Sequence, residues 1–111
     1  MKNPKFEVYK DKRGEYRFRL NAKNGQAILA SEGYSSKQGC LNGINSVKTN
    51  SQDDARFDKL TAKNGQFYFN LKARNGEIIG KSEMYTSTSG RDNGINSVRS
   101  NASEAPTEEI E

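Results

Sequence analysis

Apolar and polar residues alternate along several short stretches of this chain, with the two-residue period of a β-strand. The clearest stretch, 15–22, places four side chains on one face: Tyr16, Phe18, Leu20 and Ala22. The pattern returns at 66–73, where Phe67, Phe69, Leu71 and Ala73 occupy that face. Weaker alternation predicts further strands at 6–10, 26–32, 57–61 and 77–83. The chain therefore reads as two groups of three strands.

Glycine-containing turns separate the predicted strands. Asn-Gly pairs stand at 24–25, 64–65 and 75–76, and Lys12-Arg13-Gly14 marks another turn. Asn-Gly between alternating stretches is typical of a β-hairpin with a type I′ turn, because that turn needs positive φ at both central residues. We therefore expect hairpins with two-residue loops at the Asn-Gly pairs.

The pattern changes to a helical one after Tyr34. Ser35 to Gln38 has the form of a capping box, with Ser35 as N-cap and Gln38 three residues later. Leu41, Ile44 and Val47 then follow at three-residue spacing and form one apolar stripe, with Cys40 beside it. This arrangement predicts a short amphipathic helix.

Two glycines in the predicted helix leave an alternative open. Gly39 and Gly43 each cost about 1 kcal/mol relative to alanine in a helix interior, and Asn42-Gly43 could equally form a turn. We favour the helix because Ile95 and Val98 repeat the stripe and Thr86 repeats the cap. The small residues would then allow the helix to approach the sheet or another helix closely.

A repeat of 51 residues organises the whole chain. Residues 42–48 return almost unchanged at 93–99, and residues 6–51 align with 57–102 without a gap, with 21 identities in 46 positions. Each repeat thus has the order β-β-β-α, and a three-stranded meander alone has two open edges. We expect an α+β fold in which both repeats share one mostly antiparallel sheet, with two helices on one face and a pseudo-two-fold axis.

The expected domain covers residues 1–102, with repeats at 6–51 and 57–102. Ser51 to Asp54 is interpreted as a solvated linker between the repeats. Residues 103–111 contain four glutamates and one large apolar residue, Ile110, so we predict a disordered acidic tail. An ordered tail would instead add a strand or shield the basic residues of the domain.

Composition excludes several chemistries. The chain has no histidine, which removes His-based acid–base catalysis, Ser-His and Cys-His nucleophile pairs and the usual zinc ligand sets. Cys40 is the single cysteine, and no apolar stretch has the length of a membrane span or signal peptide. We therefore expect a cytoplasmic protein that is not an enzyme, has no cofactor or metal, and does not bind membranes.

Charge is distributed unevenly along the chain. The net charge is +4, with 18 Lys and Arg against 14 Asp and Glu, and four of these acids lie in the tail. Residues 1–102 alone thus carry a net charge of +8. A basic domain favours an anionic partner, such as nucleic acid or another polyanion.

Four motifs occur in both repeats: Gly14-Glu-Tyr-Arg-Phe and Gly65-Gln-Phe-Tyr-Phe; Asn24-Gly25 and Asn75-Gly76; Ser31-Glu-Gly-Tyr34 and Ser82-Glu-Met-Tyr85; Gly43-Ile-Asn-Ser-Val47 and Gly94-Ile-Asn-Ser-Val98. Over residues 6–102 the chain resembles the YegP-like family of small bacterial proteins of unknown function. The resemblance implies β-β-β-α units in one sheet, with strands exchanged between units, and one-copy members that pair as dimers. It implies no catalytic residues. Arg91-Asp92 and the acidic tail depart from the pattern.

Two groups of residues are candidate anion sites. The polar faces of the central strands carry Arg17, Arg19, Tyr68, Asn70 and Lys72. Basic side chains beside an aromatic ring are typical of protein surfaces that bind single-stranded nucleic acid. A solvated sheet face has the same composition. Ser35, Ser36 and Lys37 stand at a predicted helix N-terminus, where free N–H groups attract anions, although hydroxyl groups there usually act as caps.

Other residues have simpler interpretations. Glu32 with Tyr34, and Glu83 with Tyr85, could provide a pair of carboxylates for general acid–base catalysis. A junction between strand and helix that both repeats retain explains these residues equally well. Cys40 is interpreted as a small core residue.

Two classes of function stay open. One is a binding module for an anionic partner, with single-stranded nucleic acid as the specific candidate; the other is a structural or protein-interaction module. In either case we expect a monomer that imitates a dimer.

Overall fold

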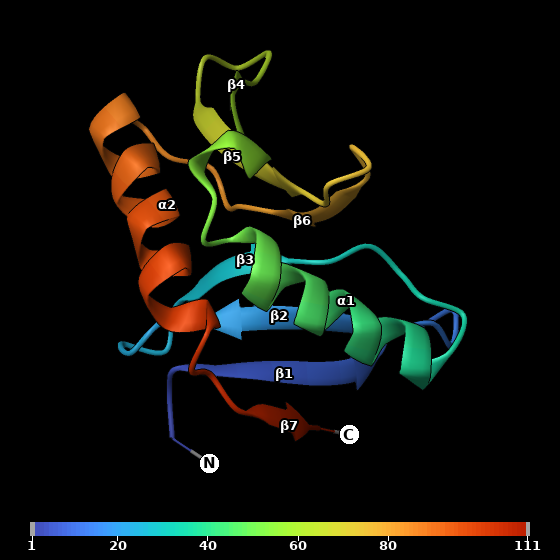
Figure 1. Cartoon of the computed structure of the whole chain (residues 1–111). Helices are drawn as coiled ribbons and strands as arrows, with labels where there is room; N and C mark the ends of the chain where they lie inside the picture. The colour runs from blue at the N-terminus through green and yellow to red at the C-terminus, as the bar shows by residue number, and fades with distance from the viewer. Residues whose placement is uncertain (1, 111) are drawn as a thin grey trace.

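The computed structural model describes residues 2–110; Met1 and Glu111, at the ends of the predicted domain and tail, lie outside the described residues. The fold is α+β, with one mixed sheet and two α-helices (Figure 1). The strands are β1 (Lys5–Lys10), β2 (Tyr16–Asn21), β3 (Ala27–Ala30), β4 (Phe57–Thr61), β5 (Phe67–Lys72), β6 (Ile78–Lys81) and β7 (Thr107–Glu109). The helices are α1 (Lys37–Asn50), α2 (Thr88–Ala102) and a short 3₁₀ turn, η1 (Asp54–Arg56).

The strand order across the sheet is β4-β5-β6-β3-β2-β1-β7. Neighbouring strands pair antiparallel, except that β7 pairs parallel with β1. The two meanders meet at the centre, where β3 and β6 pair at Ala30 and Lys81. Each repeat keeps its own three strands adjacent, and β7, which follows the second repeat, passes to the first repeat and pairs there with β1.

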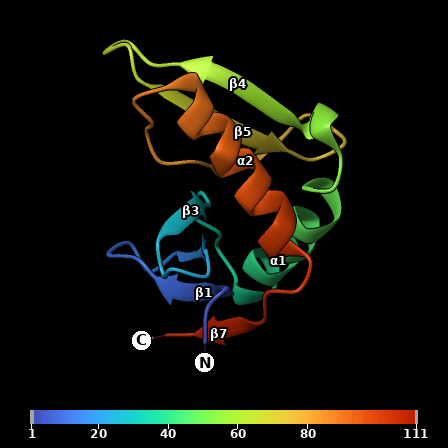
Figure 2. The ribbon, with the colours of Figure 1, turned by 90° about the vertical axis from the view of Figure 1, so that its left-hand side faces the viewer.

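The helices cover the face of the sheet that carries the apolar side chains. Phe18 and Leu20 on β2, and Phe69 and Leu71 on β5, are fully buried beneath them. Helix α1 packs on β2 and also on β5 and β6, whereas α2 packs on β5 and β3. Figure 2 shows α2 lying across the strands of both meanders. Each helix therefore spans the β3–β6 junction and holds the two repeats together.

Both helices form as predicted, and the N-cap of each lies one residue later than the predicted cap. Ser36 and Ser87, not Ser35 and Thr86, are the N-caps, and their hydroxyl oxygens accept hydrogen bonds from the N–H groups of Gly39 and Gly90. Two adjacent hydroxyl residues made the choice ambiguous in the sequence. The predicted stripe is confirmed at Ile44 and Val47, but Cys40 completes its buried part, whereas Leu41 packs at the margin.

The predicted hairpins are confirmed, but their turn type is wrong. No residue other than glycine has a positive φ among the described residues, whereas Gly14, Gly25, Gly65 and Gly76 have φ between 81° and 90°. In the 22–26 hairpin, Gly25 N–H donates to Ala22 O and Ala22 N–H donates to Gln26 O. These are three-residue loops that close on a left-handed glycine, and Asn24 caps this one by accepting from Gln26 N–H.

The helix glycines serve close packing against the sheet. A Cβ on Gly43 would lie 3.1 Å from the ring of Phe18 and would overlap the hydroxyl of Tyr34. Gly94 has the same relationship to Phe69 and Tyr85. The expectation of close helix-to-sheet approach is therefore confirmed at these two positions.

The C-terminal segment is ordered where the sequence predicted disorder. Thr107 to Glu109 form β7 beside β1, and Ala105 is fully buried. The expected disorder of residues 103–111 does not hold for this segment, because Lys5 and Lys37 bind Glu108 and Glu109 and the edge of β1 supplies backbone partners. Ser51, predicted in a solvated linker, is also fully buried as the C-cap of α1.

Candidate functional site

One row of cross-strand partners crosses the uncovered face of the sheet and links both repeats. From the β1 side to the β4 side its members are Glu7, Arg19, Ala30, Lys81, Asn70 and Asp58. Cross-strand partners share a face of the sheet, so Arg19 and Asn70 lie on the same face. Arg17, Tyr68 and Lys72 stand two residues away along β2 and β5 and join them there. The structure thus brings the five predicted face residues onto one surface.

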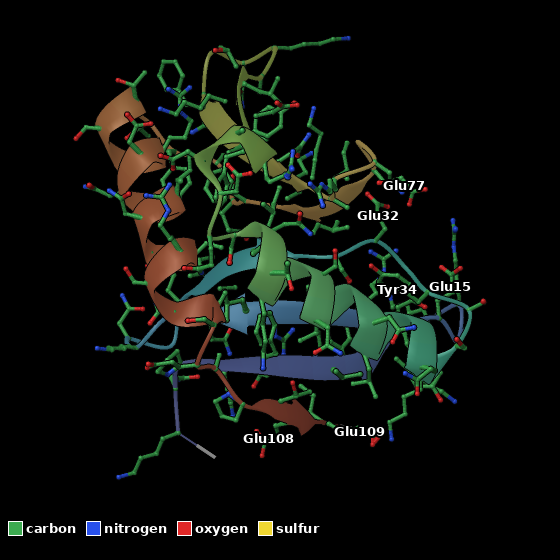
Figure 3. The ribbon with its side chains drawn as sticks, in the orientation of Figure 1. Glu15, Glu32, Tyr34, Glu77, Glu108 and Glu109 are labelled. Carbon is green, nitrogen blue, oxygen red and sulfur yellow. The ribbon has the colours of Figure 1, made fainter. Side chains whose placement is uncertain are left out.

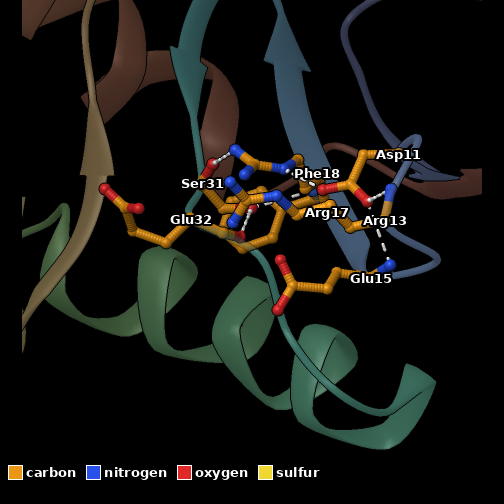
Figure 4. Close-up of polar contacts among 7 residues, drawn as sticks. All are labelled: Asp11, Arg13, Glu15, Arg17, Phe18, Ser31 and Glu32. Carbon is orange, nitrogen blue, oxygen red and sulfur yellow. Dashed lines mark hydrogen bonds and ion pairs between the residues drawn. The ribbon is translucent and has the colours of Figure 1, made fainter.

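Arg17 on this face is held by the protein itself. Its Nε donates to Asp11 Oδ2 at 2.7 Å, and its Nη1 donates to the carbonyl of Ser31 at 3.4 Å (Figure 4). Asp11 also accepts from the backbone N–H groups of Arg13 and Glu15. These bonds, the one from Arg17 first, lower the pKa of Asp11. Arg17 is therefore oriented but already neutralised.

Arg19 is paired in a similar way. Its Nε donates to Glu7 Oε1 at 2.6 Å, and its guanidinium lies 4.8 Å from the ring centroid of Tyr9. The hydrogen bond from Arg19 is the main cause that lowers the pKa of Glu7, and Lys5 contributes a further contact at 3.3 Å. The guanidinium thus has both a carboxylate and an aromatic partner.

The second repeat supplies a less charged half of the face. Lys72 pairs with Asp58 at 2.9 Å, and Tyr68 lies beneath the ammonium of Lys81 at 5.0 Å. The amide oxygen of Asn70 is buried and has no hydrogen-bond partner among the described residues. The three basic residues predicted on this face, Arg17, Arg19 and Lys72, each have a carboxylate partner. This pairing weakens the expected attraction of the face for an anion.

Lys81 is the residue that sequence analysis missed. It stands at the middle of the row, is exposed, and forms no ion pair within the part of the chain that the structure describes. Shallow hollows of about 230 and 360 Å³ flank it, and both are also lined by Ala30 and Glu83. The alternation of β6 signals the outward direction of Lys81, but only the β3–β6 pairing places it on the same face as Arg17 and Arg19, with β3 between them.

The predicted helix N-terminal site is already occupied by the protein's own groups. The hydroxyl of Ser36 accepts from Gly39 N–H as a cap, and Lys37 Nζ donates to Glu109 Oε1 at 2.7 Å. Ser35 precedes the cap and is exposed. The anion beside this helix start is therefore a carboxylate of β7.

The paired carboxylate and tyrosine motifs act as junctions. The backbones of Tyr34 and Tyr16 exchange two hydrogen bonds, and Tyr85 and Phe67 do the same in the second repeat. Burial raises the pKa of both Tyr34 and Tyr85. Figure 3 places Glu15, Glu32 and Glu77 at the same end of the molecule as Tyr34.

In the described residues no three His, Cys, Asp or Glu side chains are grouped so that they could hold a metal ion.

Comparison with known proteins places this tandem architecture in a family. The profile of a domain of unknown function, DUF1508, matches residues 11–58 and again 62–109, two matches that begin 51 residues apart. The chain belongs to the DUF1508 family. Among its relatives, a UPF0339 protein from the 5′ region of the ptx operon of Stutzerimonas stutzeri is 54% identical over 95% of each chain. The UPF0339 protein YegP of Escherichia coli is 50% identical over 86% of this chain and 87% of its own.

Solved structures of DUF1508 relatives have the same fold. The solution structure of a UPF0339 protein from Shewanella oneidensis matches with a TM-score of 0.90 at 48% identity, covering 95% of this chain and 89% of that one. The solution structure of YegP from E. coli, a protein of unknown function, gives 0.92 at 44% identity over 98% and 94%. The resemblance to the YegP-like family is confirmed. No helix in residues 2–110 is long and apolar enough to cross a membrane.

Proposed function

We propose that this protein is a non-enzymatic binding module that takes an anionic partner on the uncovered face of its sheet. The observation that carries the proposal is the position of Lys81, an exposed cation at the β3–β6 junction, between two shallow hollows. Tyr68 stacks beneath Lys81 in one repeat, and Tyr9 stacks with Arg19 in the other. Cations interleaved with aromatic rings suit a short single strand of nucleic acid, whose bases stack and whose phosphates pair.

The ion pairs of the face determine how strongly such a partner could bind. Arg17, Arg19 and Lys72 each pair with a carboxylate and are about one-third exposed, with exposed fractions of 33%, 36% and 32%. The acids paired with the arginines, Asp11 and Glu7, are only 17% and 13% exposed, so these pairs stay formed, and a phosphate would use guanidinium N–H groups that the carboxylates leave free. Lys81 has no carboxylate to share among the described residues. We therefore propose that Lys81 makes the first phosphate contact and that the arginines add weaker ones.

Titration of labelled single-stranded RNA and DNA at several salt concentrations tests this function. Three phosphate contacts predict a slope of about −2 in a plot of log K against log salt, because each contributes about −0.7. Lys81→Ala should weaken binding severalfold and make the slope shallower by about 0.7. Lys63→Ala, at the exposed tip of the 62–66 hairpin, removes the same charge and should have no effect.

Two results would reject the proposal. One is the absence of binding at low salt; the other is equal affinity of the Lys81 and Lys63 variants. Either result would favour the structural or protein-interaction role.

We also infer that the two repeats act together as one internal pseudo-dimer within a monomer. The strand order reads the same outward from the β3–β6 junction as far as β4 and β1, which supports a pseudo-two-fold axis there. Sedimentation of the whole chain over a range of concentrations should give the mass of one copy.

A further inference from the structure

The two outer edges of the sheet are finished differently. The edge of β1 is covered by β7, whereas no strand in residues 2–110 pairs with the outer side of β4. In the 51-residue alignment β4 is the counterpart of β1, with Phe57 at the position of Phe6 and Lys59 at that of Val8. The first repeat therefore shows how such an edge is completed, and the second repeat leaves its edge open.

Backbone bonds and two carboxylates hold β7 against β1. Phe6 N–H donates to Pro106 O, and Ile110 N–H donates to Val8 O, both at 2.8 Å. Glu108 accepts from Lys5 on the uncovered side of the sheet, and Glu109 accepts from Lys37 of α1 on the other side. An extended segment with two adjacent acids thus fits the edge by engaging cations on both faces.

The corresponding place beside β4 is a hollow of about 360 Å³. Its lining combines the apolar side chains of Phe57 and Ile95 with the polar residues Asp54, Lys59, Asp92, Asn96 and Arg99. In the β1 ladder the carbonyl of Val8 faces β7, and hydrogen-bond direction alternates along a strand. The backbone of Lys59, the counterpart of Val8, therefore faces outward. Phe57 N–H donates to Asp54 O, so pairing on this edge would begin beyond Phe57.

The cations at this edge are held by weak partners. Lys59 lies 3.4 Å from Asp92, with side chains 54% and 46% exposed. Arg99 pairs with Asp54, whose side chain is 81% exposed, while Arg99 Nε is buried and has no acceptor among the described residues. Exposed ion pairs contribute little, so an incoming carboxylate could replace either aspartate.

We propose that β4 accepts an extended acidic segment of a partner protein, which adds a parallel strand in the manner of β7. Main-chain pairing with Lys59 and Thr61 supplies the docking, as in other cases of strand addition to a sheet edge. A carboxylate opposite Lys59 supplies the specificity, because cross-strand partners in a parallel pair share a face. A neighbouring apolar side chain packs on Phe57 and Ile95.

Lys59 also selects against the wrong partner. Charged side chains that point inward on an edge strand prevent edge-to-edge pairing. If two copies paired their β4 strands antiparallel about Lys59, the two lysines would lie opposite each other, which is unfavourable. The same lysine that disfavours a second copy therefore favours an acidic strand.

The test uses the full chain, whose own tail occupies the β1 edge, and a synthetic peptide with the sequence of residues 104–111 as the probe. Amide resonances of the protein are followed during titration with the peptide. We expect shifts and increased exchange protection at Lys59 and Thr61, and unchanged resonances at Phe6 and Val8. A matched peptide with lysine at the positions of Glu108 and Glu109 should bind about tenfold more weakly.

Charge reversal on the protein completes the test. Lys59→Glu loses the exposed pair with Asp92, so a small decrease in melting temperature, with unchanged amide resonances away from β4, verifies its fold. This variant should lose affinity for the acidic peptide and gain affinity for the lysine peptide. No shift at β4, shifts confined to β1, equal affinity for both peptides, or association of copies through β4 would each overturn the proposal.

Discussion

Ala30 and Lys81 are cross-strand partners at the centre of the sheet, and they are also counterparts in the 51-residue repeat. A residue and its counterpart can face each other only where the two repeats meet. On the covered face, the preceding pair of counterparts also meets: Leu29 fills the space beside Gly80. At this junction the two repeats differ in side-chain size on both faces of the sheet. On the uncovered face β6 supplies the larger residue, Lys81, and on the covered face β3 supplies it, Leu29.

The Leu29–Gly80 contact predicts a strong coupling between these positions. A Cβ on Gly80 would lie 2.7 Å from Leu29 Cγ and Cδ2, so Gly80→Ala forces a fully buried side chain to move and should destabilise the fold. Leu29→Ala should cost about 2–5 kcal/mol through the cavity it leaves. In the double variant the new methyl group enters that cavity, and the combined loss should fall below the sum by about 0.5–3 kcal/mol.

Urea denaturation of the wild type, the two single variants and the double variant measures this double-mutant cycle. Additive losses would mean that the two side chains do not compete for the same space.

Ile44 should be a large contributor to stability. Its side chain is only 2% exposed and lies in the buried stripe of α1, so Ile44→Ala should cost about 2–5 kcal/mol. Thr49→Ala, on the exposed side of the same helix, should change the free energy of unfolding by less than about 0.5 kcal/mol. Lys48 is a poorer control because its ammonium lies 5.7 Å from the Phe6 ring. Equal losses at Ile44 and Thr49 in chemical denaturation would contradict the packing described for α1.

Acid should destabilise the protein through its paired carboxylates. Arg19 lowers the pKa of Glu7, Arg17 lowers that of Asp11, and Lys5 lowers that of Glu108. A carboxyl group with a lowered folded-state pKa stabilises the fold above its unfolded-state pKa and loses this contribution as the pH falls through the folded-state value. The free energy of unfolding should therefore be steady near neutral pH and decrease below the ordinary glutamate value of 4.5.

Denaturation curves of the wild-type chain and of Glu7→Gln between neutral pH and pH 3 measure this dependence. The variant should start less stable at neutral pH and lose less on acidification. A variant with the same acid slope as the wild type would show that Glu7 does not contribute.

Cys40 should be unreactive in the folded protein. Burial raises the pKa of its thiol to about 11, and the side chain is fully buried. The thiolate fraction at pH 8 is then about one-thousandth, and thiolate is the reactive form. A colorimetric disulfide reagent should modify the native chain far more slowly than the chain in guanidinium. Rapid modification of the native protein would contradict the burial of this residue.

Local sequence patterns were enough to predict the strands and helices. The ion-pair partners on the uncovered sheet face and the order of the C-terminal segment depend instead on pairing between segments that are distant in sequence. The alternation at 15–22 and the stripe of Ile44 and Val47 follow from one side of each element being buried, so they are readable in sequence. The neutralisation of Arg19 by Glu7 depends on the β1–β2 register, and the place of Lys81 depends on the β3–β6 junction. Neither is a local property.

The tail illustrates why composition alone misleads. Its glutamates repel one another in isolation, which favours disorder. Beside β1 they meet Lys5 and Lys37, which come from two different elements, and the backbone finds partners at Phe6 and Val8. The turn type also escaped prediction, because Asn-Gly serves a three-residue loop here as well as it serves a type I′ turn.

The strand β7 also limits the valence of the molecule in edge-to-edge assembly. A sheet with two open edges can add copies at both ends and grow into an open-ended ribbon. With the edge of β1 covered by its own chain, β4 is the one open edge that the sheet has within residues 2–110, and growth through one edge stops at a pair. The short acidic segment thus blocks one of the two edges through which sheets of neighbouring copies could otherwise join end to end.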